Sequence, residues 1–208
     1  MQTLDPQEIG ADRDKNRSVR YNLMAQTKKH KSISTVHSSH EIYKGRQFSF
    51  FKERITLPHN VNAEMAFVRH PGSAVIVPLF EDKTIGVIKQ FRHVINAYIY
   101  EIPAGTMDSG ESPEQCARRE LEEETGYEAT RFIPLGKTYL LPAYSDEISY
   151  IYLARDMIRT VQNLDEDEII EVHRFKIQDI LEMIDSGIII DALSILAILR
   201  AIQYLKQS

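Results

Sequence analysis

The sequence has a single cysteine, Cys116, among its 208 residues. One cysteine excludes an internal disulfide and is typical of a protein in a reducing cytoplasm. An excess of basic residues is also missing, because 25 Lys and Arg face 30 Asp and Glu, which gives a net charge of −5. This balance offers no electrostatic reason to expect binding to nucleic acid or to an anionic membrane.

Long hydrophobic runs are scarce as well. The most apolar stretch holds only eight uncharged residues between Asp191 and Arg200, far below the roughly 18 that a membrane span requires. The first thirty residues lack the apolar segment of a secretory signal. With 43% hydrophobic and 26% charged residues, the composition is that of a soluble globular protein, and we expect a cytoplasmic location.

Composition divides the chain into three parts. Residues 1–30 are polar and of mixed charge, and we assign no role to this leader. Residues 31–70 favour three strands, which we expect at 33–43, 47–57 and 62–69. A three-stranded sheet alone buries little apolar surface, so this segment is expected to pack against another subunit. Residues 71–208, which begin at Pro71-Gly72, form the main domain.

The main domain alternates strands with helices. The strand at 73–80 is apolar throughout, which predicts burial on both of its faces. Further strands are expected at 84–91, 98–103, 131–141, 148–154 and 169–175, and helices after Ser112, at 177–186 and after Asp191. The order predicts the α/β class: an α/β/α sandwich with a mixed sheet, plus the small N-terminal antiparallel sheet.

The most informative stretch runs from Gly105 to Tyr127, where a loop leads into a helix. Ser112 suits the N-cap, Pro113 the first helical position and Gln115 a capping box, while Gly126 suits the C-terminal end. At 100° per residue, the carboxylates of residues 120, 123 and 124 fall within a 100° arc. Arg119 lies one turn before residue 123 and can hold its carboxylate.

Carboxylates spaced in this way repel one another by about 0.2–0.5 kcal/mol per pair. A hard divalent cation bound through oxygen atoms would offset this repulsion. The alternative is a solvated acidic face, which is common on Glu-rich helices. Cys116 lies on the core side of this helix, which favours a packed thiol over a reactive one.

The preceding loop favours the cation. The full pattern is a Gly at 105, a Glu at 111 and the run Arg-Glu-Leu-x-Glu-Glu-x-Gly-Tyr that ends at Tyr127. This pattern resembles the Nudix box at every specified position. The resemblance implies a magnesium-dependent hydrolase, with manganese as a substitute, that cleaves a nucleoside diphosphate linked to another group. It also implies metal ligands, which are Glu120, Glu124, Glu123, the backbone carbonyl of Ala104, and Glu111 as a supporting ligand or loop brace.

Features outside the box resemble the ADP-ribose pyrophosphatase branch of this family. Pro142 lies fifteen residues beyond Tyr127, the offset of a proline that marks this branch, although a proline that opens a loop also has structural explanations. The Gln-Phe-Arg run that ends at Arg92 resembles one whose guanidinium binds the substrate diphosphate, although such an arginine is often a surface ion-pair partner. In this branch a small N-terminal sheet is exchanged within a homodimer and helps to hold the nucleoside. That role would fall to Phe48, Arg69 and His70, although Phe48 also fits plain core packing.

An acidic run, residues 165–168, precedes the strand at 169–175. Such a run is usually a solvated loop. In the branch it resembles, a mobile loop at this place delivers the glutamate that activates the attacking water. We assign this general base to Glu168, with Glu166 as the second choice, and count Glu123 with the catalytic residues as well as the metal ligands.

The resemblance therefore implies Mg²⁺-dependent hydrolysis of ADP-ribose to AMP and ribose 5-phosphate by a homodimer. One alternative is a hydrolase of another nucleoside diphosphate sugar, such as GDP-mannose. A second is a catalytically weak Nudix domain that senses a ligand. The intact acidic run of the box argues against the sensor, and no DNA-binding helix pair or basic stripe supports it.

Overall fold

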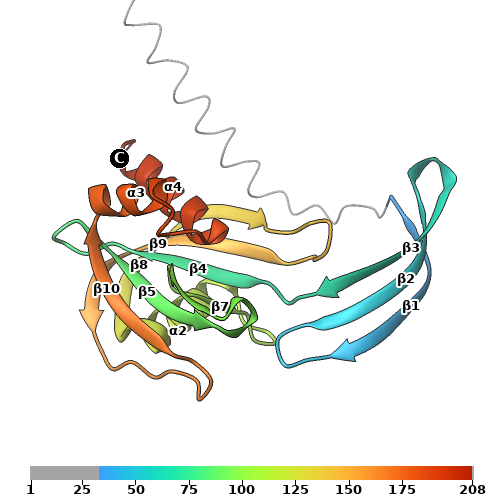
Figure 1. The fold of residues 1–208 in the computed structure, drawn as a ribbon, viewed down its shortest axis with the longest axis horizontal. Coiled ribbons are helices and arrows are strands. Elements are labelled where there is room, and N and C mark those ends of the chain that lie inside the picture. The colour runs from blue at the N-terminus through green and yellow to red at the C-terminus, as the bar shows by residue number, and fades with distance from the viewer. Residues whose placement is uncertain (1–32, 208) are drawn as a thin grey trace, which may run out of the picture.

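The computed structural model describes residues 33–207 (Figure 1), so the leader expected at residues 1–30 lies outside the described residues. An antiparallel sheet with the order β1-β2-β3 extends as a separate wing from the main body. Its strands are β1 (Thr35–Lys44), β2 (Ser49–Leu57) and β3 (Val61–Arg69). All three strands expected here are therefore present, and their ends differ from the expectation by at most two residues.

The main body contains two sheets, one with the order β10-β5-β6 and one with the order β7-β4-β9-β8. Strands β4 and β9 run parallel and their neighbours antiparallel, so the set is mixed as predicted. The strands are β4 (Ser73–Pro78), β5 (Thr84–Arg92), β6 (Ala97–Glu101), β7 (Ala104–Thr106), β8 (Tyr127–Tyr139), β9 (Ile148–Arg159) and β10 (Ile170–Lys176).

Helices cover the body on both sides, which gives the α/β/α arrangement (Figure 1). They are α2 (Pro113–Thr125), α3 (Ile177–Asp185) and α4 (Ala192–Leu205), and two short 3-10 turns span Pro58–Asn60 and His93–Ile95. None of the helices within residues 33–207 is long and apolar enough to cross a membrane.

Strand β4 lies at the centre of both cores. Val75 and Val77 are fully buried in the cluster that includes α3 and α4, whereas Ala74 and Ile76 are fully buried against α2. Because successive side chains of a strand point to opposite faces, a strand covered on both faces must be apolar throughout. The apolar run that the sequence shows here is thus explained.

The hairpin of β8 and β9 is longer than its apolar pattern indicates. We expected β9 to end at Ala154, but the strand continues to Arg159 and pairs there with the start of β8. Strand β4 pairs with β9 only as far as Ala154. Beyond Ala154, β9 pairs with β8 alone, and its exposed residues alternate less regularly around Met157, which packs against the core beside α2. The strand therefore continues where the regular apolar alternation is lost.

Candidate active site

Helix α2 forms as its local sequence dictates. The Ser112 hydroxyl accepts a hydrogen bond from the Gln115 backbone N–H, and the Gln115 side chain accepts one from the Ser112 N–H, which completes the capping box. The helix ends at Gly126, whose φ of 68° is a left-handed conformation that glycine adopts without a steric penalty. Ala117 and Leu121 pack into the core, which turns the acidic face of the helix towards a cleft.

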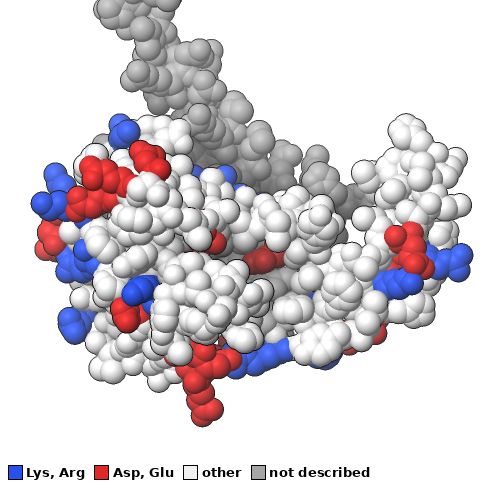
Figure 2. All heavy atoms as spheres, viewed as in Figure 1, with Lys and Arg blue, Asp and Glu red and all other residues white. Residues whose placement is uncertain are grey.

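This cleft has a volume of about 860 Å³ and is lined by α2, by strands of both body sheets, by the start of α4 and by the β1–β2 turn. Figure 2 shows acidic atoms recessed in the hollow between the body and the N-terminal sheet. Six residues that the sequence nominates line it: Arg92, Ala104, Glu120, Glu123, Glu124 and Glu168.

Arg119, in the middle of α2, is the centre of an ion-pair network that joins the helix to the preceding loop. Its guanidinium donates to both carboxylate oxygens of Glu111 at 3.0 Å, to Glu120 at 2.6 Å and to Glu123 at 3.0 Å. It also donates to the backbone carbonyl of Thr106 at 3.0 Å. Glu111 in addition accepts a hydrogen bond from the backbone N–H of Asp108, so in this structure it braces the loop, which is one of its two expected roles.

Glu120 and Glu124 are buried carboxylates, with 8% and 2% of their surface exposed. Burial raises the pKa of Glu120 to about 7, and the neighbouring Arg119 opposes the rise only in part. Burial also raises the pKa of Glu124 well above its usual value, and repulsion from Glu120 adds to the rise. The backbone N–H of Ala104 donates to Glu124 at 2.9 Å. Two desolvated carboxylates that repel each other form a site that a cation would stabilise.

Gly105 explains how the loop approaches these carboxylates so closely. A Cβ atom at this position would lie 1.9 Å from the carboxyl carbon of Glu120. Any residue other than glycine would therefore displace the Glu120 carboxylate. The carboxylate and carbonyl oxygens gathered here are the donors that Mg²⁺ and Mn²⁺ prefer, and the residues therefore fit a divalent cation chemically. Within residues 33–207, however, no three acidic, His or Cys side chains already stand in metal-binding geometry.

The loop that carries Glu168 is held in shape by hydrogen bonds between its own residues. The Asp165 backbone N–H donates to the Glu168 carboxylate at 3.2 Å, and the Glu168 N–H donates to the Asp165 carbonyl at 3.1 Å. Burial raises the pKa of Glu168, and its charge contributes to the raised pKa values of the α2 carboxylates, after burial itself. Glu166 is exposed and lies outside the cleft lining. The geometry therefore places Glu168, the first choice for the general base, nearer to the acidic face of α2.

Arg92 ends β5 inside the cleft and donates through Nε to the Glu101 carboxylate at 2.9 Å. Its side chain is 45% exposed, whereas that of Glu101 is 10% exposed. The pair thus holds the guanidinium stem and leaves its other N–H groups available to an anion.

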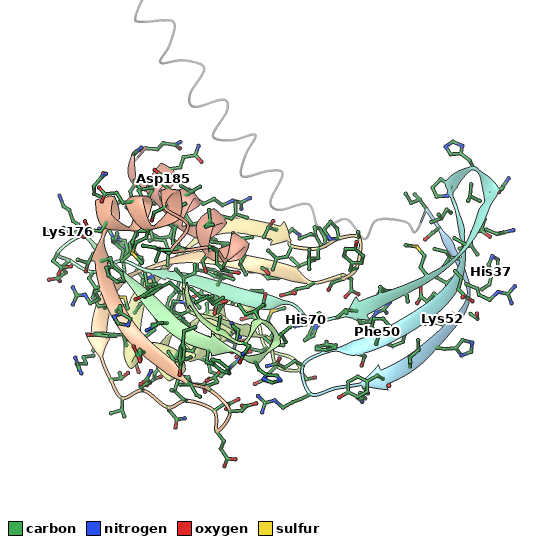
Figure 3. All side chains as sticks on the ribbon, viewed as in Figure 1. His37, Phe50, Lys52, His70, Lys176 and Asp185 are labelled. Atoms are coloured by element: carbon green, nitrogen blue, oxygen red, sulfur yellow. The ribbon has the colours of Figure 1, made fainter. Side chains whose placement is uncertain are left out.

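The three residues nominated for nucleoside binding lie outside the cleft of their own chain. Arg69 stacks over the rings of Phe51 and Phe67 on the N-terminal sheet. His70 lies where this sheet joins the body (Figure 3), and its Nδ1 accepts a hydrogen bond from the Gly72 N–H. Phe48 is 44% exposed.

Other residues in the cleft escaped the reading of the sequence. Arg46, in the β1–β2 turn, pairs with Asp165 at 2.8 Å, a contact that no local pattern reveals. Glu147 accepts a hydrogen bond from the Ser73 hydroxyl. Gln90 and Glu101 could have been identified from the sequence, because each is a polar residue inside an apolar strand. A polar side chain that is buried in this way needs a polar partner.

Comparison with known proteins agrees with this geometry. The model of the NUDIX domain matches residues 70–191. The ADP-ribose pyrophosphatase of Bacillus subtilis (strain 168) is 35% identical over 168 residues, which cover 80% of this chain and 89% of that protein. The methanol dehydrogenase activator of Bacillus methanolicus is 32% identical with the same coverage.

A solved structure entitled "Crystal structure of ADP compounds hydrolase" superposes with a TM-score of 0.74 over 85% of this chain and 96% of that chain. Its sequence identity is 21%, so this likeness shows a shared fold. Together with the family match over more than half of the sequence, the box helix and its cleft lead to one conclusion: the chain belongs to the Nudix hydrolase family.

Proposed function

We propose that this protein hydrolyses the diphosphate bond of ADP-ribose to AMP and ribose 5-phosphate in the presence of Mg²⁺. The observation that carries the proposal is that one cleft holds the α2 carboxylates, Arg92 and Glu168 together. The Bacillus subtilis relative, named an ADP-ribose pyrophosphatase, supports this choice of substrate.

Glu120, Glu123, Glu124 and the carbonyl of Ala104 would hold the divalent cation. A bound Mg²⁺ neutralises phosphate charge and lowers the pKa of water. Arg119 already pairs with Glu120 and Glu123, so it holds these two carboxylates close together when they are not bound to metal.

The remaining steps belong to the protein's own side chains. Arg92 binds the diphosphate oxygens, and Glu101 fixes its orientation. Glu168 accepts a proton from the attacking water as the water oxygen bonds to phosphorus, and the bridging oxygen leaves with the other phosphate. A raised pKa suits this role, because a general base is most effective when its pKa approaches the working pH.

A substrate panel tests the assignment. With Mg²⁺, the purified protein should release AMP from ADP-ribose, with products identified by mass. Preferential cleavage of GDP-mannose would overturn the choice of ADP-ribose but retain the chemistry. Glu168→Gln should lower kcat by about 10²–10⁴-fold with little change in Mg²⁺ affinity. If Glu166→Gln has this effect instead, the base is assigned to the wrong residue of the loop.

We further propose that the N-terminal sheet joins two copies of the chain into a homodimer. Several large apolar side chains of this sheet are exposed, namely Val36, Ile42, Tyr43, Phe48, Phe50, Val61 and Met65. A three-stranded sheet with such surfaces needs a partner to bury them. Light scattering should give twice the chain mass of 24.0 kDa, and a monomer at micromolar concentration would contradict this assembly.

A further inference from the structure

Gln90 carries a buried side-chain amide whose oxygen is not used in any hydrogen bond among the described residues. It lies in the middle of β5, where it faces Ile99 of β6 and Ile170 of β10 in the strand register. Only 4% of the residue is exposed, and its side-chain oxygen, Oε1, has no hydrogen-bond partner among the described residues. Buried polar atoms are almost always paired in folded proteins, so an unpaired one that lines a cleft indicates a missing ligand.

The position of Gln90 relates it to the substrate-binding wall. Because side chains two residues apart on a strand share a face, Gln90 lies on the same face of β5 as Arg92. Both residues line the cleft, as do Glu101 and Asp191. Glu101 uses Oε2 to hold Arg92, and Asp191 uses Oδ2 to cap α4 through Ser194. The pKa of Glu101 is raised chiefly by burial, and the Asp191 charge adds to the rise, which places the two carboxylates near each other.

The hydrogen-bonding groups of Gln90, Glu101 and Asp191, which form this wall of the cleft, indicate which part of the substrate lies against it. Gln90 Oε1, Glu101 and Asp191 present hydrogen-bond acceptors, and a further phosphate would be repelled by the two carboxylates. Adenine offers a single donor group, its exocyclic amine, and the ring nitrogens beside this amine are acceptors that acceptor oxygens would repel. A sugar instead offers several hydroxyl donors on adjacent carbons, which suits a wall of acceptors.

We infer that Gln90 accepts a hydrogen bond from a hydroxyl of the sugar beyond the diphosphate, and that it marks a sugar subsite together with Glu101 and Asp191. The inference deepens, and rests on, the proposed hydrolysis of a nucleoside diphosphate sugar. The unpaired oxygen is then a cost to the free protein that the substrate removes on binding.

The test compares the wild type with Gln90→Leu, which has a similar size but no polar atom. Two probes, ribose 5-phosphate and AMP, represent the two halves of the substrate and are titrated calorimetrically in the presence of Mg²⁺. For Gln90→Leu we expect the Kd of ribose 5-phosphate to rise about 10- to 100-fold, and the Kd of AMP to stay unchanged. The value of kcat/KM for ADP-ribose should fall by a similar factor.

Thermal unfolding without ligand separates a binding role from a structural one. If Oε1 is unpaired in the free protein, Gln90→Leu should leave Tm unchanged or raise it by about 2–12 °C. Gln178→Leu is the matched control, because Gln178 is exposed on α3, away from the cleft, and its side chain donates a hydrogen bond to the exposed residue Glu182. It should alter neither Tm nor the affinity for either probe.

The outcomes divide cleanly. A lower Tm or failure to fold for Gln90→Leu would show that the amide is paired in the free protein and would overturn the inference. So would an unchanged Kd for ribose 5-phosphate, or a loss confined to AMP. If the wild type fails to cleave ADP-ribose but its binding of ribose 5-phosphate still depends on Gln90, the proposed substrate is wrong and the sugar subsite stands.

Discussion

Arg119 offers the sharpest test of how the acidic helix is held together. Its guanidinium makes two hydrogen bonds to Glu111 and one each to Glu120, Glu123 and the Thr106 carbonyl. The Arg119 side chain is 28% exposed, and those of Glu111 and Glu120 are 13% and 10% exposed. Arg119→Ala therefore removes the partner from two largely buried carboxylates.

Removal of one member of a buried ion pair costs about 3–5 kcal/mol. The Glu123 carboxylate is 35% exposed and water compensates it in part, so we take the lower end, about 3 kcal/mol. For a protein of this size, that loss corresponds to a fall in Tm of about 6–12 °C. Arg119→Lys keeps the charge but loses the planar fork, and should lose about half as much.

The measurement is thermal unfolding in a metal-free buffer with a chelator, because a cation would mask the repulsion. Arg118→Ala is the comparison variant: Arg118 is the preceding residue of the same helix, is 45% exposed and pairs with Glu114, and it also donates to the Ala129 carbonyl and stacks over the Phe132 ring. Because these contacts leave no buried carboxylate without a partner when they are lost, the variant should cost about 1–2 kcal/mol, less than Arg119→Ala. Added Mg²⁺ should then stabilise Arg119→Ala more than the wild type. If Arg119→Ala unfolds at the same temperature as Arg118→Ala, the network does not hold the helix and loop together.

Three further experiments probe the cleft and the helix beside it. Gly105→Ala should abolish most turnover with little loss of stability, because its Cβ would displace the flexible Glu120 carboxylate; near-normal kcat would contradict this close approach. Burial raises the pKa of the Cys116 thiol to about 12, so a thiol reagent at pH 8 should label the protein no faster than it unfolds. Arg46→Ala breaks an exposed ion pair with Asp165 worth about 0.2–1 kcal/mol, and should lower kcat by at most about fivefold. Exchange of the two charges in a double variant should restore kcat, and failure to do so would show that this pair does not position the loop.

Local signals sufficed for the parts of the fold that are fixed by neighbours in sequence. Ser112, Pro113, Gln115 and Gly126 predicted both ends of α2, because capping depends on residues within one turn. The burial of β4 on both faces followed from its apolar run. These features need no knowledge of the rest of the chain.

Contacts between distant segments could not be predicted in the same way. The sequence indicates the pair of Arg119 and Glu123, one helical turn apart, but not the two bonds from Arg119 to Glu111, which depend on how the loop folds back. Arg46 and Asp165 are 119 positions apart, and only the packing of the N-terminal sheet against the body brings them together. The unpaired oxygen of Gln90 likewise becomes visible only when all its neighbours are known.

The loop after β9 connects the proposed base to α2, the helix that carries the proposed metal ligands. The last backbone carbonyls of a helix have no N–H donor within the helix. Here the loop supplies the donors. The Gln162 side chain donates to the Glu124 carbonyl at 2.6 Å, and the Asn163 backbone N–H donates to the Glu123 carbonyl at 2.9 Å. Because Glu123 and Glu124 also provide the carboxylates of the acidic face, a shift of α2 would carry the loop and Glu168 with it. We infer that the distance between the base and the carboxylates is set by these two contacts with the end of α2 rather than by the exposed acidic residues of the loop.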